Sequence, residues 1–265
     1  MKVALLGDVH ANLPALEAVL ADAQQQGAEA VWNLGDFLGY GPFPAEVIDR
    51  LRGEEAVSII GNYDAKVLRF EKKKHKWRHT KHADKYLAFR WAHERLSDEN
   101  RQYLRSLPQN VRLEVHRLRV LLTHGSPAAD DEALGPDTPN QRLEELAELA
   151  DADVVACGHS HQAFTTHAAG VQFVNPGSVG RPEGGDPRAN WALLEIEPEQ
   201  LTVHHRRTEY DVQRTVQAIR RFGLPDDFAR MLLHGRNLNQ VKFERPAGRG
   251  QEPVTEIRRT RSRMP

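Results

Sequence analysis

The sequence predicts an α/β protein, in which short buried strands alternate with helices. Several runs rich in Val, Ile and Leu are bounded by glycine, and such runs are typical of buried strands. Between several of them, apolar residues recur at helical spacing. This order of strand, helix and strand is that of an α/β fold. The five clearest runs cover residues 3–6, 31–34, 57–60, 120–123 and 154–157.

Two helices are expected among these strands. Asn12 can cap a helix whose apolar residues between Leu13 and Ala23 share one face, and Gly27 ends it. A second helix is expected from Pro139 to Ala150, with leucines on one face. Beyond Ala169 we expect a strand, a glycine-rich turn, a hairpin of two strands and two helices. These cover residues 171–174, 175–180, 191–196 with 201–205, 212–222 and about 226–234.

The composition is that of an ordinary globular protein, with 40% hydrophobic and 28% charged residues. We expect one domain over residues 1–235, with a basic insertion at about 69–85. Residues 236–265 hold eight Lys or Arg against three Glu and few apolar residues, so we expect a loosely ordered basic tail.

Several protein classes are excluded by simple features of the sequence. The single cysteine, Cys157, excludes an intrachain disulfide framework and a cysteine-rich zinc site. No apolar run approaches the roughly 18 residues of a membrane span, and the apolar start is shorter than the roughly 7–15-residue core of a signal peptide. We therefore expect a soluble cytoplasmic protein that does not enter the membrane. The net charge of −1 gives no general preference for polyanions, and the oligomeric state is left open.

Residues that can bind metal follow all five strands. The set consists of Asp8 with His10, Asp36, Asn62, His124, and His159 with His161. One such residue alone is usually a turn or surface residue. Because ligands collect at the carboxyl ends of strands in α/β folds, five strand ends that carry only such residues indicate a common site.

The donors in this set are carboxylate or amide oxygens and imidazole nitrogens, without thiolate. Such donors suit two divalent ions, Mn²⁺ foremost, with Fe, Zn²⁺, Mg²⁺ or Ni²⁺ as alternatives. Seven ligands are too many for one catalytic ion but enough for two ions that share Asp36. Two divalent ions with Asp8 and Asp36 leave about two positive charges, which attract a phosphate. They also lower the pKa of a bridging water, and the resulting hydroxide is the expected nucleophile on phosphorus.

The motifs that carry these residues resemble the ordered signature of the calcineurin-like metallophosphoesterases. They are Gly7-Asp8-Val9-His10, Gly35-Asp36, Gly61-Asn62-Tyr63-Asp64, Thr123-His124-Gly125, Gly158-His159-Ser160-His161 and the turn Asn175–Gly180. The resemblance is greatest to a small bacterial branch that includes phosphodiesterases and diadenosine tetraphosphatase-like proteins. It implies a four-layer α-β-β-α sandwich of two mixed sheets flanked by helices. It also implies one metal on Asp8, His10, Asp36 and His161, and a second on Asp36, Asn62, His124 and His159.

The third motif departs from the family pattern at one position. The family usually has His where this sequence has Tyr63, and that His is thought to stabilise the transition state or protonate the leaving group. A phenol can donate a hydrogen bond but carries no positive charge. Tyr63 is therefore a candidate catalytic residue that favours diesters or anhydrides over phosphomonoesters, unless it only packs beside the site. Asp64 is expected to orient Tyr63 or a metal ligand.

The candidate substrate contacts are Asn12, Arg181, Lys74 and Trp77. Arg181 can offer a bidentate contact to phosphate, although a solvated arginine is an equal alternative. Lys74 and Trp77 belong to the basic insertion, whose cations and interleaved aromatic residue suit a phosphate backbone and a stacked base. The alternative is a solvated loop or exposed helix.

These observations lead to a ranked set of functions. The leading hypothesis is a dimetal phosphodiesterase acting on nucleotide or nucleic-acid phosphodiesters. The first alternative is a phosphomonoesterase or a dinucleoside polyphosphate hydrolase on the same scaffold. The second is a nucleic-acid-binding or regulatory protein with weak turnover.

Overall fold

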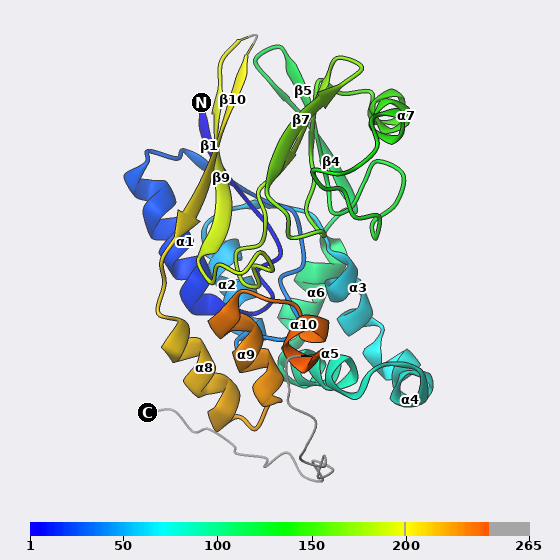
Figure 1. Cartoon of the computed structure of the whole chain (residues 1–265), viewed down its shortest axis with the longest axis vertical. Helices are drawn as coiled ribbons and strands as arrows, with labels where there is room; N and C mark the ends of the chain where they lie inside the picture. Colours follow the sequence, from blue (N-terminus) through cyan, green and yellow to red (C-terminus); the bar gives the residue numbers. More distant parts are fainter. Residues whose placement is uncertain (199, 244–265) are drawn as a thin grey trace.

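The structure is a computed structural model that describes residues 1–198 and 200–243. Its centre is a pair of five-stranded sheets that lie side by side, with helix α1 (Leu13–Gln25) beside one and helix α7 (Asn140–Ala150) beside the other (Figure 1). Each sheet mixes parallel and antiparallel pairs, and helices flank both. The predicted four-layer fold of two mixed sheets is confirmed.

The first sheet has the strand order β10-β9-β1-β2-β3. Strands β1, β2 and β3 are parallel, whereas β9 and β10 form an antiparallel hairpin beside β1. The strands are β1 (Lys2–Leu6), β2 (Ala30–Asn33), β3 (Val57–Ser58), β9 (Ala189–Ile196) and β10 (Leu201–Thr208).

The second sheet has the order β4-β5-β6-β8-β7, and its central strands β5, β6 and β8 are parallel. The strands are β4 (Asn110–Val115), β5 (Leu118–Thr123), β6 (Val154–Ala156), β7 (Phe164–Ala168) and β8 (Val171–Asn175). The outer strands β4 and β7 were not among the predicted strands. Alternate residues of β4 are exposed, so its sequence contains no continuous apolar run.

The core consists of separate layers because successive residues of a strand face opposite sides of a sheet. In β1, Ala4 and Leu6 pack toward α1, while Val3 and Leu5 face the second sheet. Between the sheets, Leu5, Trp32 and Leu34 meet Leu122 and Val154. On the outer side of the second sheet, Leu143 and Leu146 of α7 cover Phe173, whereas Leu149 is exposed.

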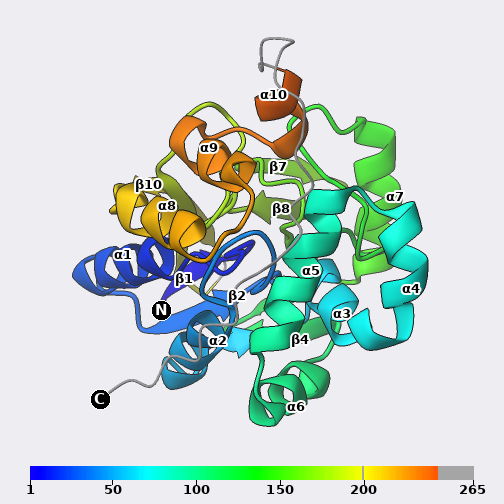
Figure 2. The same ribbon diagram turned by 90° about the horizontal axis from the view of Figure 1, so that it is seen from below.

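The remaining helices gather at one end of the sheets (Figures 1 and 2). They are α2 (Pro44–Gly53), α3 (Asn62–Leu68), α4 (Phe70–Thr80), α5 (Ala83–Arg95), α6 (Asp98–Ser106), α8 (Val212–Arg221), α9 (Asp226–His234) and α10 (Leu238–Phe243). Helices α8–α10 share an apolar cluster with Trp91 of α5 and with Tyr40. Within residues 1–198 and 200–243, no helix is long and apolar enough to cross a membrane.

The C-terminal part of the folded domain extends further than the sequence indicates. The predicted loosely ordered tail begins at residue 236, but Leu238–Phe243 form helix α10, and both Leu238 and Val241 are buried. The Lys242 side chain forms an ion pair with Asp84, near the start of α5. Helix α10 thus follows the predicted domain end at residue 235, and a helix of six residues shows too little periodicity to recognise in the sequence. Residues 244–265 of the predicted tail lie outside the described residues.

Candidate metal centre

All seven predicted metal ligands follow the carboxyl ends of parallel strands. Asp8 and His10 follow β1, Asp36 follows β2, and Asn62 opens helix α3 just after β3. From the second sheet, His124 follows β5, and His159 and His161 follow β6. Because the strands that carry these residues are parallel within each sheet, their carboxyl ends lie at one edge of that sheet. The polar residues that follow the strands of the two sheets meet there. Asp8, His10, Asp36, Asn62, His124 and His161 are all buried.

The backbone of these loops is unusual. Five of the seven residues have a φ angle in the left-handed region, which side chains with a Cβ rarely adopt. They are Asp8 (53°), His10 (47°), Asp36 (53°), His159 (65°) and His161 (59°). Such conformations cost roughly 1–3 kcal/mol each and cluster at functional sites. The strained backbone conformations at these residues therefore help to turn their side chains toward one another.

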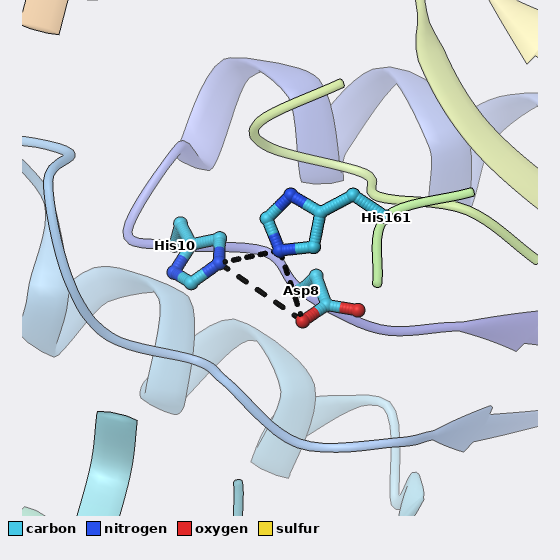
Figure 3. A group of neighbouring side chains, drawn as sticks. All are labelled: Asp8, His10 and His161. Atoms are coloured by element: carbon cyan, nitrogen blue, oxygen red, sulfur yellow. Dashed lines mark hydrogen bonds and ion pairs between the residues drawn. The ribbon is translucent and has the colours of Figure 1, made fainter. Parts of the chain in front are cut away.

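The first donor group consists of Asp8, His10 and His161 (Figure 3). The Nδ1–H of His10 donates to the Leu38 carbonyl at 2.9 Å, and that of His161 donates to the Arg181 carbonyl at 2.8 Å. Because a carbonyl only accepts, the lone pair of each ring in its neutral form lies on Nε2. The two Nε2 atoms are 3.1 Å apart, and His161 Nε2 is 3.3 Å from Asp8 Oδ1. With both rings neutral, two lone pairs and the Asp8 carboxylate face one another, and a cation would stabilise this arrangement.

The second donor group is built around Asp36 and His124. His124 donates from Nδ1 to the Leu34 carbonyl at 2.7 Å and directs Nε2 toward Asp36 Oδ2 at 3.6 Å. The same Asp36 oxygen is 3.8 Å from His10 Nε2, so this carboxylate lies between the two groups. Asn62 and His159 contact each other, with Asn62 Nδ2 3.0 Å from His159 Nδ1.

Three buried atoms that could bind a metal ion have no hydrogen-bond partner among the described residues. They are Asp8 Oδ1, Asn62 Oδ1 and His124 Nε2. An unsatisfied buried polar group costs about 1–3 kcal/mol, and native structures contain few of them. All three atoms belong to residues predicted as ligands, and oxygen and imidazole donors are what divalent ions bind. The residues present therefore fit metal ions.

Burial controls the charge of the imidazoles. Burial, with the positive charge of Arg181, lowers the pKa of His10 well below its ordinary value. Burial and His124 lower the pKa of His159 to about 4. Burial also lowers the pKa of His161, but the Asp8 carboxylate outweighs it and raises the pKa to about 9. His10 and His159 would therefore meet a metal ion as neutral ligands, and His161 would lose its proton when it binds one.

Asp64 joins two of the ligand loops. Its carboxylate accepts hydrogen bonds from the backbone N–H groups of Phe37 (3.3 Å), Leu38 (3.0 Å) and Gly61 (3.0 Å). It thus fixes the loop after Asp36 against the start of α3, where Asn62 lies, and it orients the ligand loops rather than Tyr63. Gly61 is required at this junction, since a Cβ there would overlap the backbone and carboxylate of Asp36.

The glycine turn after β8 supports the same loops through residues that sequence reasoning did not assign to the site. Ser178 Oγ donates to the Asp8 carbonyl at 2.7 Å, and Asn175 Nδ2 donates to the Gly158 carbonyl at 2.8 Å. Glu183 Oε1 lies 3.4 Å from His161 Nδ1 and forms an ion pair with Arg181. The strong turn motif was the available signal for Asn175 and Ser178, whereas nothing in the sequence pointed to Glu183.

Tyr63 lies beside the centre but has a partner that the sequence did not reveal. Its backbone N–H donates to Asp36 Oδ1 at 2.7 Å, and its hydroxyl is 2.7 Å from the hydroxyl of Tyr40. Burial and Tyr40 raise the pKa of Tyr63 well above its ordinary value. The phenol therefore remains protonated at neutral pH, as the sequence predicts.

Arg181 and Asn12 occupy different environments. Arg181 is mostly buried, its guanidinium lies 4.4 Å from the centre of the Tyr40 ring, and its Nε and Nη1 atoms have no partner among the described residues. It is therefore not a solvated arginine. Asn12 uses its amide hydrogens on the Gly180 carbonyl and the Tyr210 hydroxyl and accepts from Thr215. Its side chain links three segments instead of capping α1, and its contact with substrate stays a prediction.

The basic insertion forms helix α4 and the start of α5. Lys72, Lys73 and Lys76 are exposed, while Lys74 pairs with Glu71 at 2.8 Å. Trp77 is half-buried and packs on Phe89 of α5, with ring centroids 5.5 Å apart. The insertion is thus an exposed helix, as one of the alternatives from the sequence had it, and Trp77 packs this helix onto α5. Contacts of Lys74 and Trp77 with substrate stay predictions.

The four-layer fold and the buried carboxylate and imidazole donors at its strand ends define a metal-dependent phosphoesterase. The chain belongs to the calcineurin-like phosphoesterase superfamily, whose domain matches residues 1–199. Helices α8–α10 lie beyond this match.

Known proteins resemble the chain over most of its length. Phosphodiesterase YfcE of Escherichia coli is 30% identical over 206 residues, which cover 74% of this chain and 88% of that protein. The solved metallophosphoesterase from Sphaerobacter thermophilus has 30% identity and a TM-score of 0.73, and the match covers 89% of this chain and 100% of that one. A hypothetical protein from Pyrococcus horikoshii has 25% identity and a TM-score of 0.80, over 88% and 98% of the two chains.

Proposed function

We propose that this chain is a phosphodiesterase that uses two divalent metal ions to hydrolyse phosphodiester bonds of nucleotides or nucleic acids. The observation that carries the proposal is a set of buried ligand atoms without a hydrogen-bond partner in the described parts of the chain: Asp8 Oδ1, Asn62 Oδ1 and His124 Nε2. The donors form two overlapping groups, Asp8 with His10 and His161, and Asp8 with Asp36 and His124, each with its atoms within 4.8 Å of one another.

One ion would be held by Asp8, His10, Asp36 and His161, and the other by Asp36, Asn62, His124 and His159. The absence of thiolate and the mixture of oxygen and imidazole donors favour Mn²⁺. When bound, the ions attract the phosphate and lower the pKa of water so that it can attack phosphorus. Asp36 would serve both ions, since its Oδ2 lies 3.8 Å from His10 Nε2 and 3.6 Å from His124 Nε2.

Other residues of the chain act on the substrate itself. Arg181 can donate from Nε and Nη1 to a phosphate oxygen, since neither atom has a partner among the described residues. The Tyr63 hydroxyl can donate a hydrogen bond to the oxygen of the leaving group. A neutral phenol stabilises a departing oxygen less than an imidazolium does, and a phosphomonoester dianion needs the most positive charge. This favours diesters, as does the name of the Escherichia coli relative.

One observation favours hydrolysis of an anhydride such as a dinucleoside polyphosphate as a second candidate. Lys66 is half-buried, its Nζ lies 5.0 Å from the centre of the Tyr63 ring, and burial lowers its pKa. It forms no salt bridge within the described parts of the chain, so it can meet a second phosphate. Lys66 and Arg181 would then flank the reacting phosphate.

A substrate panel tests the proposal. Initial rates with Mn²⁺ are compared for an aryl phosphodiester, an aryl phosphomonoester and a dinucleoside polyphosphate, with Asn62→Ala as the inactive reference. We expect kcat/KM for the diester to exceed that for the monoester by about tenfold or more, which is about 1.4 kcal/mol in transition-state binding. A preference for the monoester would contradict the proposal, and a preference for the polyphosphate would select the second candidate.

A further inference from the structure

The hydroxyl of Tyr63 is held by Tyr40, a residue in the loop after Asp36. The two hydroxyl oxygens are 2.7 Å apart, and the ring centroids are 5.5 Å apart. Both rings meet His10 edge-on, at 5.3 Å for Tyr63 and 5.8 Å for Tyr40. The two tyrosine rings therefore lie next to His10, a member of the donor group with Asp8 and His161.

Tyr40 is itself fixed from two sides. The guanidinium carbon of Arg181 lies 4.4 Å from the centre of its ring, and Phe228 of helix α9 meets the ring edge-on at 5.1 Å. Tyr40 is 6% exposed and has a left-handed φ of 60°, which is uncommon for a bulky residue. A residue with a strained backbone, whose ring is held by two contacts beside a candidate metal centre, indicates that the position of the ring matters for function.

A count of hydrogens shows what the pair can do. Two hydroxyls carry two hydrogens, and their mutual bond uses one of them. If Tyr63 donates to Tyr40, the free hydrogen belongs to Tyr40. If Tyr40 donates to Tyr63, the free hydrogen belongs to Tyr63, which follows the ligand Asn62 directly. The positive charge of Arg181 beside Tyr40 polarises that phenol and favours Tyr40 as the donor.

We propose that Tyr40 is a positioning residue that donates its hydrogen bond to Tyr63 and thereby directs the Tyr63 hydroxyl hydrogen to the leaving-group oxygen of the substrate. This inference rests on the proposed phosphoester hydrolysis. Phe228 holds the ring in place, so helix α9, which lies beyond the family match, contributes to the position of Tyr40.

The variant Tyr40→Phe tests this role, because it removes the hydroxyl but keeps the ring contacts with Arg181 and Phe228. For a phosphoester with an alkyl leaving group, we expect kcat to fall about tenfold, a part of the roughly 10²–10⁴-fold that a general acid contributes. KM and the metal stoichiometry measured by calorimetry should stay the same. The loss should shrink across a series of aryl leaving groups as their pKa falls, since good leaving groups need no donor.

Two further measurements separate positioning from structure. In a Tyr63→Phe background, Tyr40→Phe should cause no additional loss, because its hydroxyl acts through Tyr63. Phe228→Leu keeps an apolar contact and should give a smaller loss with the same leaving-group dependence. Tyr86→Phe is the matched control, since this ring of α5 packs on Phe70 and its variant should behave as wild type.

Two results would overturn the inference. One is an equal loss for all leaving groups, and the other is an undiminished loss in the Tyr63→Phe background. All leaving groups are compared within one class of phosphoester, monoester or diester, namely the class that the wild-type protein hydrolyses best. A wild-type preference for monoesters would therefore defeat the diester proposal without deciding the role of Tyr40.

Discussion

The strand-end loops and helix α4 both collect ionisable side chains, but they do so in opposite ways. In the loops, Asp8 and Asp36 are at most 1% exposed, and several ligand atoms have no hydrogen-bond partner within residues 1–198 and 200–243. On α4, Lys72, Lys73 and Lys76 are exposed to water. Burying unpaired polar atoms on a strained backbone is costly, so such an arrangement indicates a ligand. Exposed lysines cost almost nothing, so their density alone is a much weaker signal.

The largest expected effect is that of Asp36→Ala, which removes the carboxylate between the two donor groups. Loss of outer hydrogen-bond partners of metal ligands typically costs about 10–100-fold, so loss of a shared ligand should lower kcat/KM by more than about 100-fold. Circular dichroism would confirm folding, and Asp153→Ala on the surface serves as the control. Near-wild-type turnover in Asp36→Ala would show that the centre does not depend on a shared carboxylate.

Asp64→Asn should have the next largest effect, because the amide places a donor among the backbone N–H groups of Phe37, Leu38 and Gly61. We expect metal affinity to fall about 10–100-fold, as for other residues that orient ligands. Calorimetric titration with Mn²⁺ measures this directly. An unchanged affinity would mean that the loops keep their geometry without Asp64.

Tyr63→His should change specificity more than overall rate. A histidine can place positive charge near the leaving oxygen, so the ratio of monoester to diester kcat/KM should rise about tenfold, within the range of general acid catalysis. Parallel kinetics on the folded, metal-loaded variant measure this ratio. If the ratio does not move, position 63 has no part in choosing the substrate.

The smallest effect on the rate of hydrolysis is expected for changes in helix α4. Neutralising Lys72, Lys73 and Lys76 together should leave turnover of a small diester within about twofold. If α4 recruits nucleic acid, the slope of log K against log salt for an oligonucleotide should fall by about three, or about one per lost phosphate contact. Identical slopes for variant and wild type would make α4 a solvated helix only.

The sequence predicted the parts of the molecule that local patterns encode. The apolar runs predicted the parallel strands. The Asp, Asn and His residues that follow these runs predicted that the candidate ligands lie together at the carboxyl ends of the strands. Helix α9 was placed at its observed bounds. Strands β4 and β7 were missed because they lie at sheet edges and are only partly buried.

The residues that sequence reasoning missed depend on contacts between distant loops. Tyr40 reaches Tyr63 because Gly39, with a φ of 105°, turns the chain where a Cβ would meet the Tyr63 ring. Glu183 reaches His161 through the turn after β8, and Phe228 reaches Tyr40 from a helix near the end of the domain. No periodicity or motif reports such contacts, so they require the folded chain.

The most direct test of the central claim is a crystal structure of the protein grown with Mn²⁺ and measured at a wavelength where manganese scatters anomalously. We predict two anomalous peaks roughly 3.5–4 Å apart, as in other two-metal sites. One peak should contact His10 and His161, the other Asn62, His124 and His159, and Asp36 should contact both. A single peak, or two peaks that do not share Asp36, would contradict the two-metal account.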